Sequence, residues 1–473
     1  MKAIKYLVAG ALMLSFTAPT MAQDVKSQVD AITKVVVDAN GDAVATKNQV
    51  KEFLKQNKKD AEALAGLGRA FLSAKNFDQA KLYADMAIKA NKNNAAGYIL
   101  HGDIASAEDN GGEAATWYEQ SITFDPQNPV AYTKYARVYQ KVDPDGAVAM
   151  LEKLRTVKPD YPVDAAAGYM YASNGQLKTA MSYYDKVADA STLDDYILMD
   201  YASTAYVLDD LDKALSLVSV GLKKYPQYTS FNRIGLYASD KQKKYDDAVS
   251  YAGKLFSTTD TIKYNVSDYV YYADALSNLG RYDDAIASYK KISSVDAENK
   301  DVNKYISTAY TKAKNFPAAV AAYEQYLKDL GENASYKDYD NFADIYLDQS
   351  EAAATPADKN EALRKAGEVY GQMADKFAHA ASYALYKQAN VHHAINPDLK
   401  VGEALPYYKK LVEVIEAQDE KKSSDTNKLV TAYTYIAVHY VQNDKVAEAK
   451  QWAAKLLEIR PDDPNGQAIM NVK

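Results

Sequence analysis

Apolar residues recur along this chain with the three- and four-residue spacing of amphipathic helices, in short segments that polar turns separate. Residues 266–299 show the pattern most clearly. Tyr269 and Tyr272 share one face of a first predicted helix, and Gly280 ends it, because glycine is common just past a helix C-terminus. Tyr289 lies on the inner face of a second predicted helix. A hairpin of this size cannot bury its apolar side alone, so we expect neighbouring hairpins to bury it together.

The spacing between alanines that stand early in each second helix gives the length of the repeat. From the first of these alanines to the sixth, every interval is 33 or 34 residues. Alanine suits this position because a larger side chain would push the two helices apart. The marker alanines are Ala80, Ala114, Ala147, Ala180, Ala214, Ala248, Ala285, Ala319, Ala366, Ala404 and Ala449. A small residue on each first helix is the expected partner, and it looks displaced by one around Gly235-Leu236.

Two successive blocks of 34 residues, 61–94 and 95–128, carry Leu67-Gly68, Tyr98 and the closing Pro126. In these residues the chain resembles the tetratricopeptide repeat (TPR) family, over roughly residues 61–463, and in particular exported TPR proteins of the Bacteroidota. The resemblance implies an all-α fold: a right-handed superhelical solenoid of about eleven TPR helical hairpins.

Domain boundaries follow from where the period starts and where it loosens. Residues 23–60 are expected to form N-terminal capping helices, 61–260 a regular TPR array, and 261–473 a less regular C-terminal TPR array with a capping helix. The stretch Glu351–Asp358 is expected to lengthen a turn inside one repeat.

Residues 1–22 have the pattern of a secretory signal peptide. Lys2 and Lys5 precede an apolar run, and small residues stand before Gln23. That run is too short to span a bilayer, and we expect no transmembrane segment elsewhere. The expected location is therefore the periplasm or the outer-membrane surface of a Gram-negative bacterium.

Composition argues against several kinds of chemistry. The net charge of −7 gives no basic footprint for nucleic acid, and the absence of cysteine excludes thiolate sites. His392 and His393 are adjacent, which is not the spacing of metal ligands on one helix face. Recurrent acidic pairs such as Asp283-Asp284 fit helix N-termini. We expect no catalytic residues, no metal and no cofactor.

The resemblance also implies a binding surface, because the first helix of each TPR unit lines the concave groove. Many of the 41 tyrosines fit core positions, and a minority fall off that register. Tyrosine together with arginine is the composition of binding hot spots. The groove residues carried over are Arg137, Gln140, Lys141, Tyr169, Ser173, Tyr206, Arg233, Tyr237, Asp274, Asn278, Lys304 and Lys312. Thr308 stands where the family's carboxylate clamp would need an asparagine after Lys304.

These features predict a non-enzymatic protein–protein interaction scaffold of the bacterial envelope, with a peptide or protein partner in the groove. The alternative is a glycan-binding component of a nutrient-uptake system, in which aromatic side chains stack on sugars. The missing lipid-site cysteine and the short insertions count against it. The partner, the process and the oligomeric state stay open.

Overall fold

A computed structural model describes residues 20–257 and 263–473, with side chains from residue 25 onward. These residues form α-helices and four short 3-10 helices, without a strand among them. The chain divides into two compact units, at Tyr228 and Thr229. The predicted all-α solenoid is thereby confirmed. The predicted boundary near residue 261 stays a prediction, and residues 1–19 of the predicted signal peptide lie outside the described part.

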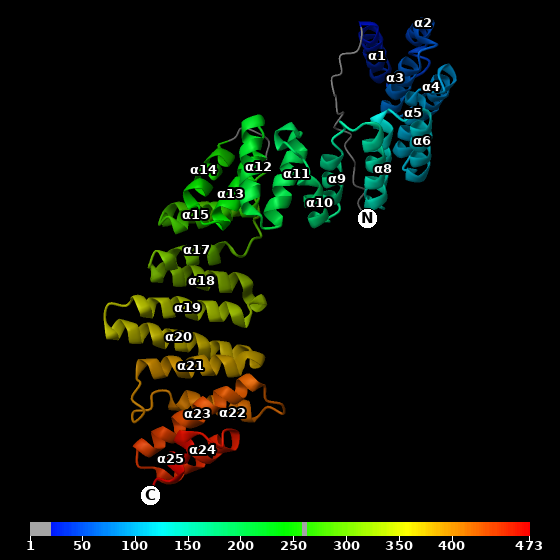
Figure 1. Ribbon diagram of the computed structural model, residues 1–473. Helices are drawn as coiled ribbons and strands as arrows, with labels where there is room; N and C mark the ends of the chain where they lie inside the picture. Colours follow the sequence, from blue (N-terminus) through cyan, green and yellow to red (C-terminus); the bar gives the residue numbers. More distant parts are fainter. Residues whose placement is uncertain (1–19, 258–262) are drawn as a thin grey trace. The chain divides into compact units, whose positions relative to one another are not determined.

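The first unit contains helices α1 to α12 (Figure 1). Their bounds are α1 (Thr20–Asp38), α2 (Lys47–Asn57), α3 (Ala61–Ser73), α4 (Phe77–Ala90), α5 (Ala95–Ala107), α6 (Gly111–Phe124), α7 (Pro129–Tyr139), α8 (Pro144–Val157), α9 (Val163–Ser173), α10 (Leu177–Tyr184), α11 (Asp195–Val207) and α12 (Leu211–Lys224).

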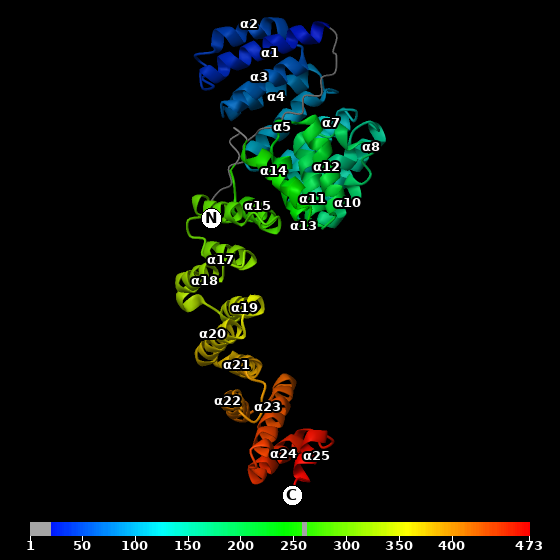
Figure 2. The ribbon, with the colours of Figure 1, turned by 90° about the vertical axis from the view of Figure 1, so that its left-hand side faces the viewer.

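The second unit contains helices α13 to α25, and α17 to α25 follow one another as a stack (Figures 1 and 2). Their bounds are α13 (Ser230–Lys241), α14 (Tyr245–Phe256), α15 (Val266–Asn278), α16 (Tyr282–Lys291), α17 (Val302–Lys312), α18 (Phe316–Leu330), α19 (Tyr336–Ala352), α20 (Pro356–Lys376), α21 (Ala381–Ile395), α22 (Leu405–Glu416), α23 (Ser423–Gln442), α24 (Val446–Ile459) and α25 (Pro464–Met470).

Helices α3 to α24 pair in order as α3/α4, α5/α6 and so on to α23/α24, which makes eleven hairpins as predicted. All eleven marker alanines, from Ala80 to Ala449, have 0 % of their surface exposed. At this position each second helix therefore packs against its neighbours through a methyl group, and a larger side chain would overpack the contact.

In three hairpins, the glycine of the first helix, Gly102, Gly168 or Gly235, makes room for a tyrosine sixteen positions later. A Cβ atom on Gly168 would lie 2.6 Å from Cδ1 of Tyr184, and one on Gly235 would lie 2.7 Å from Cδ1 of Tyr251. Gly168 stands seven residues before the left-handed turn residue Gly175, whereas Gly235 stands eight before Lys243, so the small residue of this hairpin is displaced by one as predicted. The ring of the second helix fills the space that a side chain would need.

The tight turn inside most hairpins contains one residue in the left-handed backbone region. Gly175 and Gly280 occupy it with φ of 75° and 76°. Asp209, with φ of 63°, and Lys243, with φ of 59°, occupy the same position without the freedom of glycine. Each stands five residues before its marker alanine, so the turn is part of the repeat.

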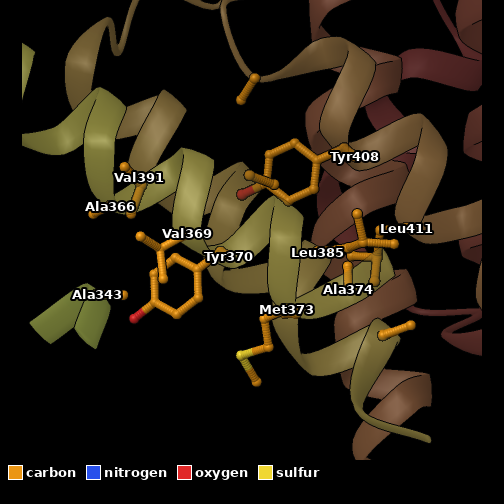
Figure 3. Close-up of a cluster of buried hydrophobic side chains, with 14 of the residues drawn as sticks. Ala343, Ala366, Val369, Tyr370, Met373, Ala374, Leu385, Val391, Tyr408 and Leu411 are labelled. Carbon is orange, nitrogen blue, oxygen red and sulfur yellow. The ribbon is translucent and has the colours of Figure 1, made fainter. Parts of the chain in front are cut away.

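The insertion at Glu351–Asp358 lengthens helices rather than a turn. Helix α19 has 17 residues and α20 has 21, and only three residues separate them. The predicted long turn is therefore wrong, since the added residues continue the helical pattern. Tyr370, Met373 and Tyr408 are buried here, and the Tyr370 hydroxyl points toward Ala343 (Figure 3).

Candidate functional site

All twelve predicted groove residues lie on, or directly after, the first helix of a hairpin. Six belong to α7, α9 and α11 of the first unit, and six to α13, α15 and α17 of the second. We call the side of the first helices that carries these residues the groove face. Its two parts lie in different units and are described separately.

In the first unit, the C-terminal ends of α7 and α9 are tied together. Nδ2 of Asn174 donates to the carbonyl oxygen of Gln140 at 2.6 Å, and Nζ of Lys141 donates to the carbonyl oxygen of Ser173. Both acceptors are neutral, so the charge of Lys141 is not cancelled by them. Gln140, Lys141 and Ser173, three of the predicted groove residues, thus lie together.

Beside this junction lie two tyrosines from successive hairpins. The rings of Tyr169, on α9, and Tyr196, on α11, meet edge to face with centroids 5.3 Å apart. Tyr196 is 41 % exposed, and Tyr169 is partly buried. Burial raises the pKa of Tyr196, with Asp194 adding to the rise and Arg137 opposing it. The guanidinium of Arg137 therefore acts on this pair from α7. Tyr206, near the end of α11, is also partly buried.

Arg137 itself is exposed on α7. Within the described residues, no hydrogen bond or ion pair joins its guanidinium to another side chain. Asp103, on α5, is a nearby carboxylate, but it accepts from Lys134 at 2.7 Å and from the hydroxyl of Tyr118 at 2.8 Å. The neighbouring acidic group is already satisfied, and the arginine keeps its donors for solvent.

In the second unit, Arg233 and Tyr237 converge on one carboxylate. Nε and Nη2 of Arg233 donate to the two oxygens of Asp268 at 2.7 and 2.9 Å, and the hydroxyl of Tyr237 donates to Oδ1 at 2.6 Å. Asp268 is 0 % exposed and Tyr237 is 8 % exposed. Oδ2 of Asp268 also accepts from the backbone N–H of Asn265, which completes a capping box at the start of α15. This cluster closes the junction between α13 and α15.

The next junction, between α15 and α17, is polar but more exposed. Nζ of Lys312 donates to Oδ1 of Asn278 at 3.2 Å. The hydroxyl of Tyr289 donates to Asp274 from the second helix of the same hairpin. Nζ of Lys304 lies 5.6 Å from the ring centroid of Tyr326. Asp274, Asn278 and Lys312 are thus neighbours, whereas Lys304 faces an aromatic ring.

Sequence reasoning missed Asp240, which is partly buried on α13. Burial raises the pKa of its carboxyl to about 6, Asp274 adds to the rise, and Lys312 opposes it. Its Oδ1 has no hydrogen-bond partner in the described part of the chain. A signal for its neighbour Asp274 was present, because a tyrosine follows fifteen residues later there, as Tyr118 follows Asp103.

Neither metal binding nor a membrane span finds support in residues 20–257 and 263–473. No three histidine or acidic side chains among them are placed to hold one ion. None of the helices in this part has both the length and the apolar character that crossing a bilayer requires. What the groove face offers chemically is hydrogen-bond donors, carboxylates and aromatic rings.

Comparison with known proteins identifies the repeat. A family model described as "Tetratricopeptide repeat" matches residues 47–95 and 273–335. Among curated proteins, the BBSome complex member BBS4 of Bos taurus is 26 % identical over 180 residues, 38 % of this chain and 34 % of that protein. Cellulose synthase operon protein C of Pseudomonas fluorescens is 26 % identical over 159 residues, 32 % of this chain and 12 % of that protein. The chain thus spans a minor part of either relative.

Solved structures include similar chains. The C-terminal part of a TPR repeat-containing protein from Cytophaga hutchinsonii is 20 % identical, with a TM-score of 0.43, and the match covers 58 % of this chain and all of that one. The pilF protein of Pseudomonas aeruginosa is 18 % identical, with a TM-score of 0.35, over 42 % of this chain and 92 % of that one.

Proposed function

This chain is a tetratricopeptide-repeat protein, and we propose that it is a non-enzymatic scaffold that binds a peptide or protein partner on its groove face. Its helical repeats account for nearly all described residues, so partner binding is the function that their surface can supply. The bovine relative is, by its name, a member of a protein complex, which agrees with a role in assembly.

One observation carries the proposal. Side-chain bonds join the first helices of successive hairpins, at α7–α9 and at α15–α17, and leave exposed polar groups between them. Such bonds hold neighbouring first helices in register, so a partner meets a surface that is already ordered. A preorganised surface costs less free energy to engage than a flexible one.

A photo-crosslinking amino acid placed at Tyr169, on the groove face, tests the proposal in cells. The matched control is the same amino acid at Ser182, which is exposed on the second helix α10 of the same hairpin. We expect a protein adduct from position 169 and none from position 182. Equal adducts from both positions, or an adduct from 182 alone, would place the partner elsewhere and refute the groove-face proposal.

We also propose export to the envelope of a Gram-negative bacterium. The support is the sequence before Gln23, with its lysines, apolar run and small residues. Mass spectrometry of the N-terminus after expression in a Gram-negative host tests it directly. The expected N-terminal residue is Gln23 in the periplasmic fraction, and an intact Met1 in the cytoplasm would refute export.

A further inference from the structure

Helix α2, at one end of the first unit, carries a row of lysines on its exposed side (Figure 2). Lys47, Lys51 and Lys55 follow one another at intervals of four residues, so their side chains share one face of the helix. Lys58 and Lys59 directly follow the helix and extend the row. All five side chains are exposed, and we call them the lysine face.

The opposite side of α2 anchors the helix to the fold. Val50 and Phe53 are buried in a cluster that α1 and α3 complete. Nδ2 of Asn57 donates to Oε1 of Gln28, on α1, at 2.8 Å. This anchoring uses none of the five lysine ammonium groups. Like charges four residues apart weaken a helix, so the row of lysines does not serve the stability of α2.

The acidic groups near the lysine face offset only part of its charge. Glu52 is the one acidic residue among residues 47–59, and it pairs with Lys55, the one lysine of the five that has an ion pair among the described residues. Asp42 and Asp60 flank α2, where their side chains accept hydrogen bonds from backbone N–H groups. Helix α1 contributes two lysines and three aspartates, which nearly cancel.

This positive face belongs to a chain whose net charge is −7. At physiological salt, exposed charges more than about 8–10 Å apart are largely screened from one another. The distant acidic residues therefore do not cancel an attraction that acts close to α2. A surface that approaches α2 meets five lysines and one glutamate, and an anionic surface complements them.

The residue types of the lysine face favour a lipid surface over a protein. Protein interfaces are enriched in arginine and aromatic residues and depleted in lysine. Helix α2 has no arginine, and its one aromatic residue, Phe53, is buried on the opposite side. Lysines on flexible stems suit a mobile array of phosphate headgroups. The proposed export favours lipid headgroups over nucleic acid as the phosphate surface that the chain meets.

We propose that the lysine face docks the chain on a membrane surface rich in anionic phospholipids. The helix lies along the headgroups and does not enter the bilayer as a span. This inference goes beyond the scaffold function, because it concerns α2 rather than the groove face. Only the choice of lipid over nucleic acid rests on the proposed export, which the N-terminal mass measurement tests separately.

The test sediments the full chain with vesicles of phosphatidylcholine alone, or of phosphatidylcholine and anionic phosphatidylglycerol in equal parts. The wild type should bind the mixed vesicles and bind phosphatidylcholine far less. A lysine at an anionic surface contributes about fivefold in affinity, so Lys47→Gln/Lys51→Gln should weaken binding to the mixed vesicles by about tenfold or more. Added salt should weaken the binding of the wild type.

The matched control removes two lysines elsewhere in the same unit. Lys89→Gln/Lys92→Gln, at the end of α4 and just after it, should leave binding unchanged. Residues 1–22 are present in every variant, so their apolar run contributes equally throughout. Circular dichroism should show both double variants folded, because all four lysine side chains are exposed.

A fluorescent probe locates the contact. The chain has no cysteine, so Asn48→Cys places a single environment-sensitive dye on the exposed side of α2, next to Lys47. Its emission should shift to the blue on the mixed vesicles. The same dye at Ser182→Cys, on the exposed side of α10, should not shift.

The proposal is overturned if the mixed vesicles bind the chain no better than phosphatidylcholine does. It is also overturned if Lys89→Gln/Lys92→Gln loses as much binding as Lys47→Gln/Lys51→Gln, or if the dyes at positions 48 and 182 respond alike. Capture of an acidic protein by α2, with the vesicles left unbound, would assign the lysine face to a protein and refute the membrane. Adducts from position 169 do not depend on these results, so the scaffold function is tested separately.

Discussion

Arg137 and Arg233 were both expected on the groove face, and the structure gives them opposite surroundings. Arg233, in the second unit, has a side chain that is 20 % exposed and joined to a fully buried Asp268. Arg137, in the first unit, is exposed and meets no carboxylate among the described residues. Residue type and helix face are the same in both cases. Whether the neighbouring hairpin supplies an acid therefore decides if the arginine holds the fold together or stays available to a partner.

The largest expected effect comes from removing the acid of the paired arginine. Asp268→Ala leaves the guanidinium of Arg233 without its partner, and breaking a buried ion pair costs about 3–5 kcal/mol. The chain has two tryptophans, Trp117 in the first unit and Trp452 in the second. Urea unfolding followed by fluorescence in a Trp117→Phe background therefore reports on the second unit.

The matched control for this variant is Arg137→Ala, read through Trp117 in a Trp452→Phe background. An exposed, unpaired arginine should change the free energy of unfolding of the first unit by less than about 0.5 kcal/mol. Separate reporters are needed because two units need not unfold as one. Equal destabilisation by Asp268→Ala and Arg137→Ala would erase the contrast between the units.

A second pair of variants tests one tyrosine in each unit, Tyr237 in the second unit and Tyr196 in the first. Tyr237→Phe keeps the ring stacked on Tyr271 and removes the hydroxyl that bonds Asp268. The loss should be about 1.5–3 kcal/mol, the range for a hydrogen bond to a charged group. Tyr196→Phe should leave the stability of the first unit unchanged within about 0.5 kcal/mol. Urea unfolding in the two single-tryptophan backgrounds measures both, and a neutral Tyr237→Phe would contradict the account.

A pH titration contrasts the paired Asp268 with the unpaired Asp240 of the same unit. The folded pKa of Asp240 is raised to about 6, above the value of about 3.9 for an unfolded aspartate. The folded state therefore binds more protons between these values, and Asp240 makes stability fall as pH rises from 4 through 6. Asp240→Asn should remove part of that slope, of the order of 1 kcal/mol after allowing for partial exposure.

Asp344 and Asp348 also have pKa values that burial raises, so the second unit should keep a residual slope in the variant. The difference between wild type and Asp240→Asn isolates one carboxyl. Unfolding followed through Trp452 at pH 4, 5, 6 and 7 supplies the measurement. An identical slope in both proteins would mean that Asp240 titrates as a solvated group.

The smallest predicted effect concerns a feature that the two units share. Asp209→Gly in the first unit and Lys243→Gly in the second relieve a left-handed residue at the same turn position. A non-glycine residue in the left-handed region destabilises the folded state by about 1–2 kcal/mol, which the glycine variant avoids. Glycine also raises the entropy of the unfolded chain, which lowers stability by about 0.4–1 kcal/mol, so we expect a net increase in the free energy of unfolding of about 0.5–1 kcal/mol. Thermal unfolding should show similar gains in both units, and opposite signs would mean that the turns are not equivalent.

Much of the fold was predictable because its cause is local and repeated. The spacing of the marker alanines, confirmed by complete burial, depends only on hairpin geometry. The partner of Arg233 was not predictable in this way, because Asp268 lies 35 residues away, after a junction of irregular length. The helix face predicted that Arg137 and Arg233 point toward the groove, but not which one would meet an acid there. That they contact a partner stays a prediction.

Asp240 shows a second limit of the sequence. It stands eight residues before its marker alanine, as the predicted groove residue Tyr206 does, but it was not among the predicted groove residues. Its raised pKa comes from burial and from Asp274 on the next hairpin. Neither cause is visible from residue order, because both depend on how closely α13 and α15 approach. A search for a carboxylate followed by tyrosine fifteen residues later would have found Asp103 and Asp274, and still not Asp240.

The most direct measurement records how fast the side-chain Nε–Hε NMR signals of the seven arginines exchange with water in the full chain. The account predicts an Arg233 signal that is protected from exchange, since its Nε proton bonds Asp268. It predicts an Arg137 signal that exchanges rapidly, since this side chain is exposed and has no hydrogen-bond partner in the described part of the chain. Equal exchange rates for Arg233 and Arg137 would contradict the claim that one arginine holds the fold together and the other stays available.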